Sequence, residues 1–194
     1  MRLTLMKAVE ITNLLLHLGR LLSEGSSNTG LSRNQWLALR FFAYANSCSR
    51  NVSCFSAHQS TSQGTASQII KHLVEEGYVE QQPAPYDGRS SIFNLTDKGK
   101  DVIAHDPLET FFREVEAVED ADLQNLEHAL RAFIKHFGKQ SGEAGVCANC
   151  HWASKRRLRN RHGSSQLEFY CKYFEVDVPN DDAGRLCSWF SGKS

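Results

Sequence analysis

The segment 61–99 constrains the fold more than any other part of the chain. In its first half apolar side chains recur at three- and four-residue steps, and Gly77 stands where that helix would end. Residues 78–82 and 91–95 then have the composition of two short strands, with turn chemistry at Asp87-Gly88 between them. A helix followed directly by a two-stranded hairpin predicts a winged helix-turn-helix.

Helices are also expected before this segment. The apolar spacing predicts an amphipathic helix over Met6–Leu22. Ser32-Arg-Asn-Gln35 is a capping box, so a second helix is expected to begin there and to run to about Asn46. A short helix over 52–60 follows, and Thr61 is the N-cap candidate of the helix after it. The first part of the chain is therefore mainly α with a small β wing.

The polar face of the helix after Thr61 carries small hydroxyls, amides and one cation. Such groups can enter a major groove and bond to base edges and phosphates, although an ordinary solvated helix face has the same composition. Arg89, near the hairpin tip, is placed to reach a phosphate or the minor groove. The candidate DNA-binding residues are Ser62, Gln63, Thr65, Ser67, Gln68, Lys71 and Arg89.

Four motifs in this region resemble the MarR family of bacterial transcription regulators, over roughly residues 6 to 137. They are Gly64-Thr-Ala-Ser-Gln68, Leu73-x3-Gly77-Tyr-Val79, Asp87-Gly-Arg89-Ser and Leu95-Thr-Asp-Lys-Gly99. The resemblance implies binding to double-stranded DNA and an obligate homodimer with interlocked terminal helices. It also leaves room for a small-molecule ligand between the dimer helices and the wing domain, but no residue pattern identifies one. Winged helices that never touch DNA are the alternative.

Apolar stripes support a dimer independently of the resemblance. One stripe follows Pro107, and a second follows the helix-capping candidates Asp120 and Asp122. Together with the first helix these stripes exceed what one small winged domain can cover, so a two-fold partner is expected, with packing inside one chain as the alternative. The stripes consist of Leu108, Phe111, Phe112, Val115, Leu123, Leu126, Leu130, Phe133, Ile134 and Phe137.

Four of the six cysteines lie in the last quarter of the chain with the spacing C-x2-C-x20-C-x15-C. They are Cys147, Cys150, Cys171 and Cys187, and they follow a Gly-rich linker at 138–145. The linker divides the chain into a winged-helix and dimerisation domain, 1–138, and an irregular cysteine-rich module, 139–194. In a reducing compartment such a group predicts a metal or cluster site and not disulfides. One close pair plus two single cysteines favours a [4Fe-4S] cluster, with Zn²⁺ or uncoordinated thiols as alternatives.

The flanking residues of these cysteines resemble the cluster-binding stretch of high-potential iron-sulfur proteins over about 45 residues. The matching stretches are Cys147-Ala-Asn-Cys150, Tyr170-Cys171-x2-Phe174 and Gly184-Arg-Leu-Cys187-Ser-Trp189. The resemblance implies that the four cysteines hold a [4Fe-4S] cluster, and the nearby aromatic residues would keep it dry. Cys147-x2-Cys150-His151 also matches the haem attachment motif, but that chemistry needs export and leaves two cysteines unused. Cys48 and Cys54 are expected to be buried small hydrophobes, with a redox-sensing thiol as the alternative.

The charges balance, with 22 Lys and Arg against 22 Asp and Glu. This balance is a sum over segments of opposite sign. Residues 101–127 hold nine acids and one base, whereas residues 147–172 hold six bases and one acid, a local charge of 6 − 1 = +5. The basic run Lys155–Arg161 in this second segment could compensate for a wing that carries a single cation, or it could serve the cysteine site.

These features predict a cytoplasmic DNA-binding transcription regulator whose operator binding is modulated by a [4Fe-4S] cluster. The N-terminus lacks the apolar core of a signal peptide, and no membrane partner is expected. No nucleotide loop, H-E-x-x-H motif or nucleophile elbow points to an enzyme. The alternatives are a regulator with structural zinc and a redox protein that uses the winged domain only as a dimer scaffold.

Overall fold

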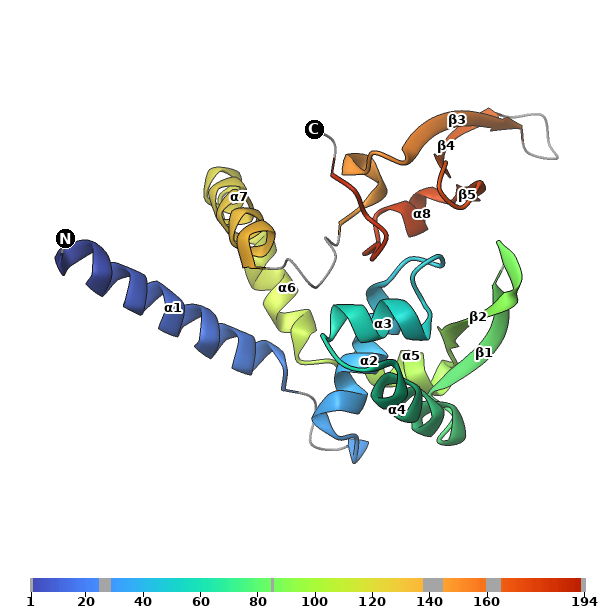
Figure 1. Ribbon diagram of the computed structural model, residues 1–194, viewed down its shortest axis with the longest axis horizontal. Coiled ribbons are helices and arrows are strands. Elements are labelled where there is room, and N and C mark those ends of the chain that lie inside the picture. Colours follow the sequence, from blue (N-terminus) through green and yellow to red (C-terminus); the bar gives the residue numbers. More distant parts are fainter. Residues whose placement is uncertain (1, 25–28, 85, 138–144, 160–164, 193–194) are drawn as a thin grey trace.

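The computed structural model describes residues 2–24, 29–84, 86–137, 145–159 and 165–192 of the chain. Figure 1 shows three parts: a long helical stem on the left, a winged-helix head below, and the C-terminal module above the head. The elements in chain order are α1 (Arg2–Leu22), α2 (Arg33–Tyr44), α3 (Val52–His58), α4 (Gln63–Glu75), β1 (Val79–Ala84), β2 (Asp87–Leu95), α5 (Asp97–Ala104), α6 (Leu108–Glu116), α7 (Asp120–Phe137), a 3-10 turn (Cys147–Asn149), β3 (Ala153–Arg159), β4 (Ser165–Cys171), β5 (Val176–Val178) and α8 (Asn180–Ala183).

The head is built as the sequence predicts. Ser32 caps α2 in a capping box, since its hydroxyl accepts from the Gln35 amide and its own amide donates to Gln35 Oε1 at 2.7 Å. Helix α4 is capped by Ser62, whose hydroxyl accepts from the Thr65 amide at 3.1 Å. The expectation that Thr61 is the N-cap is therefore wrong by one residue. Gly77, at φ +73°, ends this helix in the left-handed region, as predicted.

The core of the head lies between α2, α3, α4 and the hairpin. Its buried residues come from each of these elements and are contiguous, so the head forms one packed unit. Phe42 and Phe55 are almost fully buried, and their rings lie 5.9 Å apart between centroids. Helix α3 begins after Asn51, whose side chain accepts from the Cys54 amide at 2.9 Å.

The wing is longer than predicted. Strands β1 and β2 pair antiparallel from Val79↔Leu95 to Pro83↔Ser91, so most of the expected 83–90 loop is strand. Helix α5 directly follows β2 and was not predicted. Thr96 caps it through the Gly99 amide at 3.2 Å, and Gly99 packs so closely on the Tyr78 carbonyl oxygen that a Cβ there would lie 2.1 Å away.

The stem exposes many large apolar side chains. Helix α1 projects away from the rest of the chain in Figure 1, and α7 lies above it on the same side. In α1 the side chains of Leu5, Met6, Leu14 and Leu16 are each more than 60% exposed. Further exposed residues on the stem are Val9, Ile11, Leu18, Leu21, Phe112, Leu126, Phe133 and Ile134. Apart from Leu5 and Leu16, these residues belong to the stripes that the sequence predicts as dimer surfaces, and nothing in the described part of the chain covers them.

The stem joins the head through a buried ion pair. Arg40 of α2 donates to both carboxylate oxygens of Asp106, at 2.6 and 2.5 Å, and also to the carbonyl oxygens of Leu22 and Glu24. Both side chains of the pair are almost completely buried. The guanidinium therefore fixes the end of α1 and the start of α6 to the head.

The C-terminal module is not irregular, and that expectation is wrong. Its strands form an antiparallel sheet in the order β3-β4-β5, with Ala153 opposite Cys171 and Cys171 opposite Val176. The usual alternation of apolar and polar residues is hidden because β3 carries three consecutive cations, Lys155 to Arg157. The Gly-rich linker predicted at 138–145 lies outside the described residues, except for Gly145.

Candidate DNA-reading face and cysteine-lined cavity

Helix α4 presents its predicted polar residues to solvent. The side chains of Gln63, Thr65, Ser67, Gln68 and Lys71 are all exposed, whereas Ala66, Ile70 and Leu73 on the opposite face are buried. Ser62 is exposed as well, but its hydroxyl is occupied in capping the helix. The structure thus gathers these six candidates on one face of α4.

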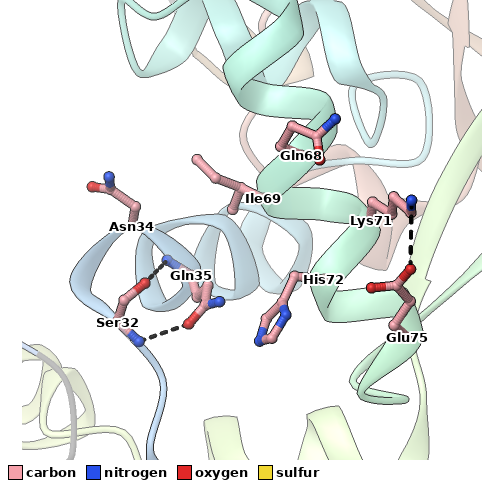
Figure 2. A pocket seen from close by; sticks show the side chains of 8 residues that line it. All are labelled: Ser32, Asn34, Gln35, Gln68, Ile69, Lys71, His72 and Glu75. Carbon is pink, nitrogen blue, oxygen red and sulfur yellow. Dashed lines mark hydrogen bonds and ion pairs between the residues drawn. The ribbon is translucent and has the colours of Figure 1, made fainter.

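A groove runs between this face and the start of α2. Figure 2 shows Gln68, Lys71, His72 and Glu75 of α4 on one side of the groove, and Asn34 and Gln35 of α2 on the other. The Lys71 ammonium lies 3.7 Å from the Glu75 carboxylate, an exposed and therefore weak ion pair. Lys71 remains available to a stronger anion because both groups are well solvated.

Arg89 lies near the wing tip, in the first residues of β2, where Asp87 holds the backbone. The Asp87 carboxylate accepts from the Arg89 amide at 3.0 Å and from the Ser90 hydroxyl at 2.8 Å. These two hydrogen bonds lower the pKa of Asp87, because they stabilise its charged form. The Arg89 side chain itself is exposed and has no ion-pair partner within the described residues.

The four C-terminal cysteines line a single cavity. Cys147, Cys150 and Cys187 are each at least 93% buried, and Cys171 is half-buried. The cavity is small, with about 10 Å³ open to the centre of a water molecule. Its remaining walls are largely aromatic and apolar: Trp152, Ala153, Tyr173, Phe174, Val178 and Trp189. The structure brings together cysteines that are up to 40 residues apart in the sequence.

The thiols surround this cavity but do not converge on one point. Nowhere in the described ranges do three or more His, Cys, Asp or Glu side chains come together closely enough to hold a single metal ion. Burial raises the pKa of the Cys147 thiol to about 12, and the neighbouring Cys187, Cys150 and Cys171 add to the shift. A cation is therefore needed to turn these thiols into thiolates, the form that ligates metals.

Two residues of the head complete the cavity, and sequence reasoning did not find them. Cys48 and Asn46 lie in the turn between α2 and α3 and both line the cavity. Cys48 and Cys54 are each 3% exposed, so the prediction that both are buried is confirmed. The spacing of the C-terminal cysteines carries no signal for Cys48, because the contact arises only when the module packs on the head.

The Cys187 sulfur is surrounded by hydrogen-bond donors. Burial raises its pKa, but hydrogen bonds from the Asn46 side chain, the Trp189 backbone and the Ser49 side chain oppose the shift. Such donors stabilise negative charge on sulfur. Asn46 and Ser49 belong to the head, so the charge state of this cysteine is felt directly by the α2–α3 turn.

The module is docked on the head by backbone pairing and by Asp182. The Asn46 amide donates to the Leu186 carbonyl oxygen at 2.8 Å, and the Leu186 amide donates to the Tyr44 carbonyl oxygen at 2.9 Å. The buried Asp182 of α8 accepts from both the amide and the hydroxyl of Ser47, at 2.9 and 2.8 Å. The backbone hydrogen bonds therefore fix which residues of the module and head lie opposite each other, and the Asp182 carboxylate adds a charged contact between them.

Two further contacts connect the module to the wing. Asp182 also pairs with Arg50 at 3.4 Å, and Arg50 donates to the Asn94 side chain of β2 at 2.8 Å. At the wing tip the Tyr86 hydroxyl donates to the Cys48 carbonyl oxygen at 3.1 Å, and the Tyr86 ring packs on Phe174, a wall of the cavity, with 4.5 Å between ring centroids. The wing thus rests on the walls of the cysteine cavity.

The head, with its capped α2, α3 and α4 and its β1–β2 wing, defines a winged helix-turn-helix protein. Residues 29–90 match the model of the MarR family. No helix in the described ranges is long and apolar enough to cross a membrane.

Solved structures share the fold of this chain over about 70% of its length. A MarR/EmrR family transcriptional regulator from Acinetobacter sp. ADP1 is 18% identical, with a TM-score of 0.51 over 69% of this chain and 97% of that one. The MarR family transcription regulator SP03579 is 20% identical, with a TM-score of 0.50 over 70% of this chain and 91% of that one. No curated protein matches the sequence.

Proposed function

We propose that the protein is a dimeric DNA-binding transcription regulator whose affinity for its operator is set by a [4Fe-4S] cluster in the C-terminal module. The observation that carries the proposal is the position of the cysteine cavity. It lies at the junction between the module and the winged-helix head, and its walls include residues of the α2–α3 turn and the support of the wing tip.

DNA binding is supported by the head. The polar face of α4 offers hydroxyls, amides and Lys71 to a major groove, and Arg89 extends from the wing next to it. The match of residues 29–90 to the MarR family points to the same activity. The apolar residues exposed on α1 and α7 fit a second copy of this chain, which would place two reading heads on adjacent half-sites.

The donor set favours a cluster over a single zinc ion. Cys147 and Cys150 form one close pair in the sequence and Cys171 and Cys187 are single, and a cubane presents four irons at separate corners to such a set. Aromatic walls would keep the site dry, as acid-labile sulfide requires. When bound, the cluster would supply a one-electron redox couple and a centre that reacts with oxidants.

Contacts between the module and the head would couple occupancy of the cysteine site to the position of the wing. The module has a small core of its own, built around Cys147, Val178 and Ala183, so its folding depends on what its cysteines hold. With the module folded, Asp182 engages Ser47 and Arg50, and Phe174 supports Tyr86. With the module unfolded these contacts are lost, and the wing and the α2–α3 turn lose their support.

The test has two arms. Protein purified without air is analysed for iron, acid-labile sulfide and zinc, and we expect about four irons and four sulfides per chain, with Cys147→Ser losing both. A zinc content of one per chain without sulfide would overturn the cluster. In the second arm, the protein is used to select duplexes from a random-sequence DNA pool. Failure to enrich any sequence at moderate salt would overturn the regulator and favour a redox protein with a winged scaffold.

A further inference from the structure

The basic run of the C-terminal module does not line the cysteine cavity. Lys155, Arg156 and Arg157 lie on β3, and none of the three is among the cavity residues. All three side chains are exposed to solvent. None of the three side chains is therefore in contact with the cysteine cavity.

The register of the sheet places these cations on two different faces. Lys155 pairs with Phe169 and Ala153 pairs with Cys171, so Lys155 and Arg157 share the head-facing side of the sheet with Ala153, and of these three only Ala153 lines the cavity. Arg156 points to the opposite face. There it forms an ion pair with Asp177 and lies over the Tyr170 ring at 4.1 Å.

The two cations on the head-facing side lack this neutralisation. Arg157 has no ion-pair partner within the described residues, and Lys155 contacts only the ring of Phe169, at 5.2 Å. Glu168, which is opposite Arg156 in the register, lies on the outer face. The head-facing side of the hairpin thus carries uncompensated positive charge.

This charge lies beside the wing. The Tyr86–Phe174 contact brings the wing tip against the turn that follows β4, and Arg89 is three residues beyond Tyr86. In Figure 1, α4, the tip of the β1–β2 hairpin, β5 and the β3–β4 hairpin follow one another up the right side of the molecule. A duplex that contacts α4 and the wing and continues along this side would reach the β3–β4 hairpin.

We propose that the β3–β4 hairpin is a second wing, which binds the phosphate backbone of duplex DNA outside the first wing through Lys155 and Arg157. The inference rests on the proposed DNA-binding function and extends it to the C-terminal module. It also gives a reason why the module has to be docked for tight binding, because an undocked module carries these two cations away from the DNA.

The experiment compares the salt dependence of binding between charge-neutralised variants. The probe is a 40-base-pair duplex that wild-type protein has enriched from a random-sequence pool, with binding measured by fluorescence anisotropy between 50 and 300 mM KCl. Each phosphate contact contributes about 0.9 to the slope of log K against log salt. Over one decade of salt, from 1 M to 0.1 M, that slope corresponds to about eightfold in affinity. Lys155→Gln/Arg157→Gln should therefore lower the slope by about 1.8 and weaken binding by roughly tenfold or more.

Arg156→Gln is the matched control, since it removes one charge from the same strand but on the opposite face. We expect its slope to stay within about 0.3 of wild type, whereas Arg157→Gln alone lowers the slope by about 0.9. Unchanged far-UV circular dichroism and iron content would show that each variant is folded and loaded.

The second arm shortens the duplex. Trimming the DNA to the segment protected by α4 and the first wing should remove the difference between wild type and the double variant. Equal slopes for all variants on the long duplex would overturn the second wing while leaving the DNA-binding function in place. Failure of the wild-type protein to enrich or bind any duplex would overturn both.

Discussion

Replacing Asp182 with alanine removes the charged contact that holds the C-terminal module on the winged-helix head. The Asp182 carboxylate is 11% exposed and accepts two hydrogen bonds from Ser47, at 2.9 and 2.8 Å. A hydrogen bond to a charged group contributes about 1.5 to 3 kcal/mol, so the loss of two destabilises the docked state by about 3 kcal/mol or more. At 1.4 kcal/mol per factor of ten, this is roughly a 100-fold shift toward the undocked state.

Hydrogen exchange measured by mass spectrometry follows this shift directly. Amides of Asn46, Ser47 and Leu186 are donors across the junction, and their protection should fall by roughly 100-fold in Asp182→Ala. Asp181→Ala is the control, because Asp181 is the exposed neighbour on the same short helix. Equal exchange at these amides in wild type and Asp182→Ala would refute the claim that Asp182 holds the module in place.

Three further predictions concern the stability of the head. Asp106→Ala leaves the buried Arg40 without its partner and should lower the free energy of unfolding by about 3 to 5 kcal/mol in urea denaturation, whereas a loss below about 1 kcal/mol would contradict the buried pair. Gly99→Ala places a Cβ 2.1 Å from the Tyr78 carbonyl oxygen and should cost on the order of 3 kcal/mol in the same assay, so a neutral effect would contradict this packing. Burial, together with the nearby charges of Asp106 and Glu109, raises the pKa of Tyr44 to about 12. Between pH 10 and 12 the folded state therefore keeps a proton that the unfolded state releases, so the melting temperature should fall over this range. Tyr44→Phe should make that fall smaller.

The sequence predicts the head well because its signals are local. The Ser32 capping box, the helical spacing of α4 and the left-handed Gly77 each depend on residues a few positions apart, and the structure has all three. The misses in the head are also local in origin. Ser62 and Thr61 are both good caps, so the sequence alone does not choose between them, and α5 is a short helix whose Gly99 argues against helix until the packing on Tyr78 is seen.

The cysteine site was predicted only in part. The four C-terminal cysteines share one cavity, but the contributions of Cys48 and Asn46 depend on long-range docking that no spacing rule encodes. The same holds for β3, where the residues that define the strand are cations and become interpretable only when Phe169 and Cys171 are seen across from them. Local patterns determine the parts, whereas the junction between them depends on tertiary packing.

In the proposed function the state of the cysteine site sets the affinity of the head for DNA. Its most direct test is the dissociation constant for a selected duplex, measured at one salt concentration with cluster-loaded protein and with the same protein after removal of iron and sulfide. Coupling of about 1 to 3 kcal/mol predicts that removal weakens DNA binding 5- to 150-fold. Cys147→Ser is expected to lack the cluster from the start, so the same removal treatment should change its dissociation constant little. Dissociation constants that agree within about twofold between the loaded and cluster-free protein would contradict this coupling between the cysteine site and DNA binding.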